Sequence, residues 1–212
     1  MIQEFQNLFT LIATATGVYV AVGGLHAWRR ETIGKRDLEL CQNVIERFYE
    51  AEHKMALLRS PASYSWESEK RPKDGLETLE ESNRRDTLYV PLARINTQSQ
   101  FWSELFSYRF RMRALFGESA HDAFNPIDEA YRSFNAAASV RYQALYINPR
   151  GMGVPEQARF EQIIWAGTVD PDPIAEKMLS AVSAMEAICV PIVRSRYRPQ
   201  RFCEWIDKYR LF

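Results

Sequence analysis

The sequence lacks the short motifs that usually reveal an activity. Its 212 residues hold no glycine-rich phosphate-binding loop, no cysteine and histidine spacing of a zinc site and no GxSxG nucleophile elbow. It also lacks an excess of charge of either sign, since 27 basic side chains balance 27 acidic ones. Because a nucleic-acid-binding surface usually needs a basic excess, nucleic acid is not an expected partner. We likewise expect no metal and no cofactor.

Cysteine, glycine and lysine are scarce. Cys41, Cys189 and Cys203 are odd in number and far apart, which predicts free thiols in a reducing compartment and no disulfide framework. There are only nine glycines, helix-forming residues are plentiful, and no pair of strands is indicated, so we expect an all-α protein. The basic residues comprise 21 arginines and 6 lysines, a balance that favours planar, bidentate ion pairs.

The chain does have one long stretch without a charged side chain, residues 5–28. A membrane-spanning helix needs about 20 mostly apolar residues, and this stretch supplies them, although three threonines and three glycines weaken it. Two alternatives stay open, a buried helix of a soluble core and a cleaved export signal. A core helix normally turns a charged face to water, and an export signal begins with basic side chains, which residues 1–7 lack. We therefore expect a single transmembrane helix, with residues 1–36 as the membrane anchor.

Basic side chains follow this stretch and do not precede it. Arg29, Arg30, Lys35 and Arg36 come directly after it. Because basic residues that flank a span stay in the cytoplasm, the N-terminus is expected outside and the C-terminal domain in the cytoplasm. These four side chains are expected to contact membrane lipid.

Small residues recur on one side of the same stretch. Ala13, Gly17, Ala21 and Gly24 follow a spacing of three and four residues. Small residues let two membrane helices approach closely, so this stripe predicts self-association. The alternative is that alanine and glycine are simply common in membrane spans.

After residue 36 the apolar residues fall on one helical face. Leu38, Cys41, Ile45 and Phe48 predict an amphipathic helix, which continues straight from the span and ends at Ser60.

Three more long helices are expected. The first closes near Gly117, and Pro91 either opens it or kinks it. The second begins at Asn125, taken as its cap, and the third begins after Asp170. Residues 62–86 are expected to form an exposed connection, in which a short helix near residues 76–83 is an open alternative.

Four long amphipathic helices with short connections predict an antiparallel helical bundle. We assign residues 37–198 to this bundle in the cytosol. Residues 199–212 are expected to form a basic and aromatic C-terminal tail.

Five residues separate Arg47 from His53. This spacing resembles the Arg-x(4–6)-His motif of HEPN-family ribonucleases, which are small helical bundles, some of them membrane-associated accessory proteins of antiviral systems. The resemblance implies that His53 acts as general acid or base and that Arg47 stabilises a phosphate, usually across a dimer. It covers these residues alone, and Phe48 stands where the motif has a polar residue. The alternative is that both are surface residues of an amphipathic helix.

A basic and aromatic segment lies near the end of the chain. Its functional interpretation is contact with phosphates of a membrane surface or of RNA. Its alternative is a solvated helix end, where cations suit the negative end of the helix dipole. The segment contains Arg194, Arg196, Arg198 and Arg201.

Together these patterns predict a single-pass membrane-anchored protein whose helical bundle binds protein partners or copies of itself at the inner face of the membrane. It would have no chemistry of its own. The alternative is a membrane-tethered HEPN-like ribonuclease or antiviral accessory protein.

Overall fold

The computed structural model describes the backbone of residues 2–197 and the side chains of residues 14–194 except 15, 26, 27 and 30. This part of the chain consists of helices and loops without a strand, which confirms the all-α class. The helices are α1 (Ile2–Leu58), the 3₁₀ helix η1 (Ser65–Ser68), α2 (Leu79–Phe116), α3 (Glu118–Asp122), α4 (Asn125–Ile147), α5 (Val154–Ile164) and α6 (Pro173–Tyr197).

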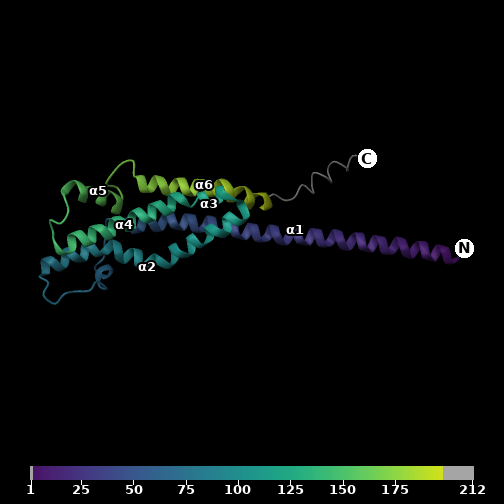
Figure 1. The fold of residues 1–212 in the computed structure, drawn as a ribbon, viewed down its shortest axis with the longest axis horizontal. Coiled ribbons are helices and arrows are strands. Elements are labelled where there is room, and N and C mark those ends of the chain that lie inside the picture. Colours follow the sequence, from purple (N-terminus) through teal and green to yellow (C-terminus); the bar gives the residue numbers. More distant parts are fainter. Residues whose placement is uncertain (1, 198–212) are drawn as a thin grey trace.

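The C-terminal half of α1 packs with α2, α4 and α6 into a four-helix bundle (Figure 1). α1 contacts α2 and α6, and α4 contacts the same two helices. Successive long helices run in opposite directions, with α3 in the turn between α2 and α4, and α5 in the connection from α4 to α6. The predicted antiparallel helical bundle is therefore confirmed.

α1 is one continuous helix that belongs to two parts of the molecule. From Leu40 to Leu58 it buries apolar side chains in the bundle at intervals of three and four residues. Residues 14–36 extend beyond the other helices, as Figure 1 shows, and we call them the projecting segment. At a rise of 1.5 Å per residue this segment is about 35 Å long. The expected continuity through Gly34 is confirmed.

The predicted membrane span occupies residues 5–28. Among the residues whose side chains the structure describes, no helix contains a stretch that is both long and apolar enough to cross a membrane. The predicted span therefore has no support there. Residues 5–13 lie outside the described side chains.

Two helix starts differ from the prediction. α2 begins at Leu79, well before Pro91, because Thr78 and Glu81 form a capping box: the Thr78 hydroxyl accepts from the Glu81 amide at 3.2 Å, and Glu81 accepts from the Thr78 amide at 3.0 Å. The expected exposed connection is correspondingly shorter. Asn125 is the first residue of α4 rather than its cap, and its side-chain amide donates to Asp122.

Aromatic rings fill the centre of the bundle. Trp102 of α2 stacks on Tyr131 of α4 with 4.8 Å between ring centroids. Phe48 of α1 meets Phe124 edge to face at 4.9 Å, and both of these rings are fully buried. Burying a large apolar side chain contributes about 1.5–3 kcal/mol, so these contacts hold three helices together.

Two of the cysteines meet across the bundle. Cys41 of α1 and Cys189 of α6 are free, fully buried thiols whose side chains form a hydrogen bond. Burial raises the pKa of both thiols, so they stay protonated at neutral pH. Cys203 lies outside the described residues.

Arg94 closes the C-terminal end of α1 from the neighbouring helix α2. The last carbonyls of a helix have no partner within that helix. Arg94 donates to the carbonyl of Leu58 at 3.2 Å and to that of Ser60 at 2.6 Å. Its guanidinium also forms a bidentate pair with Glu67 of η1, at 2.7 and 3.1 Å. Arg94 is only 8% exposed, so these contacts lie largely out of water.

Similar contacts occur at two other helix ends. Arg59 donates to the carbonyl of Ile163 at the end of α5, at 2.8 Å, and pairs with Asp172 at 2.6 Å. Arg84 of α2 donates to the carbonyl of Tyr146, at 3.2 Å, in the last turn of α4. A cation at the carbonyl end of a helix also suits the helix dipole. Arginines from other elements thus complete three helix ends on one side of the bundle.

Replacing Arg94 with methionine is expected to lower the free energy of unfolding by about 3–5 kcal/mol, because Glu67 and the carbonyls at the end of α1 lose their donors. Urea titration of the full chain in mild detergent, followed by circular dichroism, measures the change. Arg111→Met removes an exposed arginine from the same helix and should change stability by no more than about 0.5 kcal/mol. Equal losses in the two variants would contradict the assigned role of Arg94.

Candidate functional site

The projecting segment exposes large apolar side chains on all its sides. Successive residues of a helix turn by about 100°, so neighbouring apolar residues along this segment face different directions. The apolar surface therefore surrounds the helix instead of forming one stripe. A helix that is apolar on all sides is typical of a lipid or protein environment rather than of water. The side chains concerned, each at least half exposed, are Val18, Tyr19, Val20, Val22, Leu25, Trp28 and Ile33.

The small-residue stripe lies on this segment, and its described members do not pack against the other described residues of the chain. A methyl group placed on Gly17 or Gly24 would meet nothing within 4 Å, and Ala21 is exposed. Ala13 lies outside the described side chains. The described part of the stripe thus leaves room for the close approach of another helix.

Basic residues lie where the projecting segment meets the bundle. Arg29 and Arg36 are exposed, and Lys35 pairs with Glu31 at 2.8 Å. Arg194 is exposed near the end of α6, which packs on α1 and ends on this side of the bundle (Figure 1). These cations therefore lie on the side of the bundle from which the projecting segment leaves. Of the other residues predicted to contact phosphate, the side chains of Arg30 and Arg196, and the whole of Arg198 and Arg201, lie outside the described residues.

Arg47 and His53 lie six residues apart on α1, and the described contacts of Arg47 do not include His53. Arg47 donates to Glu50 at 2.9 Å and to Glu104 of α2 at 3.3 Å, and it lies over the ring of Phe101. His53 is exposed, and six residues along a helix separate the two positions by about 9 Å. The contacts of Arg47 favour a structural role. The ribonuclease hypothesis, which needs a second copy of the chain, stays a prediction.

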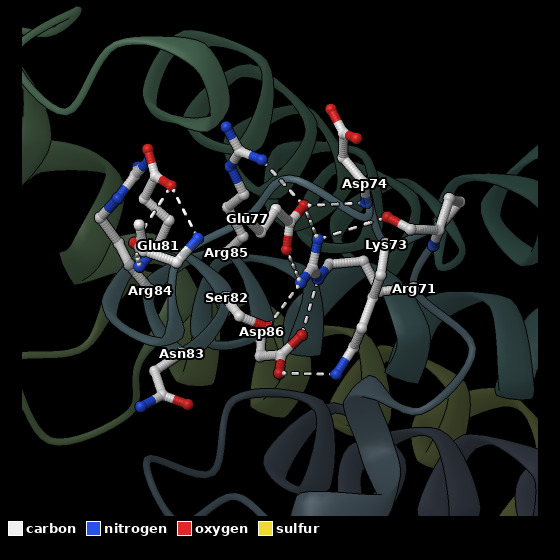
Figure 2. Close-up of polar contacts among 12 residues, drawn as sticks. Arg71, Lys73, Asp74, Glu77, Glu81, Ser82, Asn83, Arg84, Arg85 and Asp86 are labelled. Atoms are coloured by element: carbon white, nitrogen blue, oxygen red, sulfur yellow. Dashed lines mark hydrogen bonds and ion pairs between the residues drawn. The ribbon is translucent and has the colours of Figure 1, made fainter.

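A buried ionic cluster fixes the loop before α2 (Figure 2). Arg71 donates through both terminal nitrogens to Glu77, at 2.9 and 2.7 Å, and through Nε to Asp86 at 2.6 Å. The hydroxyl of Ser82 and the carbonyl of Pro72 accept its remaining hydrogens. The Arg71 side chain has no exposed surface, and each of its N–H groups has a partner. Arg71 therefore has no free donor for a ligand.

The charges of this cluster strongly favour the ionised carboxylate of Glu77. Hydrogen bonds from Arg71 hold the pKa of Glu77 well below its usual range, while burial acts in the opposite direction. A hydrogen bond from Arg85 Nη1 to Glu77 Oε1, at 2.8 Å, lowers this pKa further. The same pair raises the pKa of Arg71. Strong shifts of this kind can mark a catalytic site. Here the donors of Arg71 are all used within the chain, so the cluster serves to hold the loop against α2.

Three side chains of α3 could hold a metal ion. Glu118, His121 and Asp122 each place one ligand atom within 4.8 Å of the others. Glu118 and Asp122 are exposed, and Glu118 also pairs with Arg113 at 2.9 Å. Exposed groups of this composition are common without a metal, so we assign none here.

Comparisons of the chain with protein-family models, with curated proteins and with solved structures found no match. The functional interpretation therefore rests on the residues of this chain.

Sequence reasoning missed the buried arginines, although one signal for them was present. Arg59, Arg71, Arg94 and Arg141 are each less than a tenth exposed. The excess of arginine over lysine indicated bidentate ion pairs in general. It did not indicate which arginines form them, because their partners come from other elements.

The Arg71 cluster predicts a specific dependence of stability on pH. Because the pKa of Glu77 is lowered on folding, its contribution is complete above about pH 4.3, the unfolded value, and is lost as the pH falls toward the folded value. Glu77→Gln should therefore be less stable than the wild type at pH 7, and the difference between the two stabilities should shrink steadily as the pH falls below the unfolded pKa of Glu77. Urea titrations at several pH values measure this.

Glu80→Gln is the matched control, since Glu80 is an exposed acid three residues after Glu77, in the first turn of α2. Its stability should run parallel to that of the wild type over this pH range. If the free energies of unfolding of Glu77→Gln and the wild type differ by the same amount at every pH, the role assigned to Glu77 is wrong.

Proposed function

We propose that this protein is a single-pass membrane-anchored helical bundle, which acts by binding protein partners or copies of itself at the inner face of the membrane. The observation that carries the proposal is the projecting segment, a helical extension of the bundle with apolar side chains exposed on all its sides. Lipid is the environment that best accommodates such a surface.

The length and borders of the uncharged stretch support this environment. Residues 5–28 would span about 36 Å as a helix, and the apolar core of a bilayer is about 30 Å thick. Trp28 is 64% exposed at one border, where tryptophan suits the headgroup layer. Arg29 and Arg36, both exposed, follow it.

The position of the basic residues supports the orientation. Arg29 and Arg36 lie in the part of the projecting segment nearer the bundle, and Arg194 lies near the end of α6, which ends on the side of the bundle from which this segment leaves. Basic residues next to a span stay in the cytoplasm and contact anionic lipid headgroups. We therefore place the bundle in the cytoplasm and the N-terminus outside.

The small-residue stripe supports self-association as the way in which the anchor acts. In lipid the hydrophobic effect does not drive helices together, so close packing through small residues is a common source of affinity. Gly17, Ala21 and Gly24 do not pack against the other residues that the structure describes, which favours their contact with a second copy.

A charge within the uncharged stretch should prevent membrane insertion. Ala21→Arg places a cation inside the span, at a cost of about 2.5–3.5 kcal/mol near its centre. We expect it to move a large part of the protein from the membrane pellet to the supernatant after alkaline extraction. Ile33→Arg adds the same charge at an exposed position of the same helix beyond the span, and it should stay in the pellet with the wild type. Wild-type protein that remains in the supernatant without detergent would refute the anchor.

Enlarging the stripe should weaken self-association without affecting the bundle. Gly17→Leu adds bulk where nothing in the chain is near, so folding is unchanged but a second helix is kept at a distance. Chemical cross-linking in detergent micelles should show dimers or higher oligomers for the wild type and several-fold fewer for this variant. Val22→Leu is the control, because Val22 is turned about 140° around the helix from Gly17. Equal cross-linking in all three proteins would exclude the stripe as the contact.

A further inference from the structure

A cavity of about 290 Å³ lies between α2, α4 and α5, at the end of the bundle opposite the projecting segment. Two arginines line it, Arg84 from α2 and Arg141 from α4. No acidic side chain is among the described residues that line it. The cavity is therefore positively charged and distinct from the surfaces discussed above.

Arg141 has donors that the described part of the chain does not satisfy. It is only 7% exposed, and its Nη2 donates to Glu161 at 3.2 Å. Its Nε and Nη1 have no hydrogen-bond partner among the described residues. A buried guanidinium with unpaired N–H groups is unfavourable. Arg141 lines the cavity, so a ligand that draws its guanidinium toward the cavity would give these groups an acceptor.

The positive charge at the cavity is not fully balanced. Arg84 donates to the carbonyls of Leu145 and Tyr146 and forms no ion pair among the described residues. Glu161, the partner of Arg141, also accepts from Gln157 at 3.0 Å. The pKa of Glu81 is lowered mainly by hydrogen bonds from Thr78 and, from a distance, by the charge of Arg84. No carboxylate is in contact with Arg84 among the described residues, which leaves its guanidinium able to attract an anion.

The remaining walls are largely apolar. Leu88 and Leu145 line the cavity and belong to a small apolar cluster with Met152, separate from the main core. Pro149 adds to this wall, and the exposed Thr87 lies at the cavity. A ligand with an anionic group and a small apolar body matches both kinds of surface.

We propose that this cavity binds a small organic anion, with a carboxylate or phosphate group held by Arg141 and Arg84 and an apolar body against Leu88 and Leu145. The site belongs to the bundle and does not depend on membrane insertion. It therefore stands or falls separately from the proposed function.

Isothermal calorimetry on the full chain in non-ionic detergent tests the site with three probes of similar shape: benzoate, phenyl phosphate and neutral benzamide. Ionic strength is kept constant with sodium chloride, because anion binding depends on screening. We expect saturable one-to-one binding of benzoate, phenyl phosphate or both, and none of benzamide. The anion that binds with the higher affinity shows whether the site prefers a carboxylate or a phosphate ester.

Two variants and a control locate the binding. Arg141→Gln should lower the affinity for the anion by at least about tenfold, since a charge-assisted hydrogen bond is lost. Thr87→Trp should block the cavity, and because Thr87 is exposed this variant is expected to fold even if Arg141→Gln does not. Arg111→Gln removes an exposed arginine elsewhere on α2 and should bind like the wild type.

Several outcomes would overturn the proposal. The first is that neither benzoate nor phenyl phosphate binds saturably. The second is that benzamide binds as tightly as the anions, and the third is that Thr87→Trp binds the anion with the affinity of the wild type. Unchanged affinity in a folded Arg141→Gln variant would overturn it as well.

Discussion

The end of the bundle opposite the projecting segment depends on one requirement: the last carbonyl groups of its helices need hydrogen-bond donors. A helix that stops inside a protein leaves its last carbonyls without backbone partners. Here Arg94, Arg59 and Arg84 supply donors to the ends of α1, α5 and α4. Each comes from another element, so one side chain both satisfies a helix end and joins two parts of the chain. The bundle end is thereby held by polar contacts as much as by its apolar core.

Arginine suits this role better than lysine because its guanidinium presents several donors in a fixed plane. Arg71 uses all of them on carboxylates, a hydroxyl and a carbonyl. Arg141 does not, since two of its nitrogens have no partner among the described residues. That contrast separates an arginine that stabilises the fold from one that is available to a ligand. Arg141 lines a cavity that could hold such a ligand.

The continuity of α1 connects the bundle to the projecting segment. Within the bundle its apolar residues face the other helices, whereas from Val18 to Leu25 apolar residues are exposed on all sides. One continuous helix therefore joins a packed domain to a surface that suits lipid or another helix. If the projecting segment is the anchor that we propose, this helix connects the anchor directly to the bundle.

Local patterns in the chain were enough to predict the helical class, the antiparallel bundle and the inward face of each long helix. Apolar spacing is a local property, whereas the start of α2 at the capping box of Thr78 and Glu81 was not predicted, although the two residues are close in the sequence. The sequence did not indicate which arginines are buried or what they bind. Their partners are distant along the chain, as for Arg59 and Asp172, which are separated by 113 positions. For the same reason the meeting of Cys41 with Cys189 and the cavity at Arg141 could not be foreseen, since each requires helices to pack in one particular arrangement.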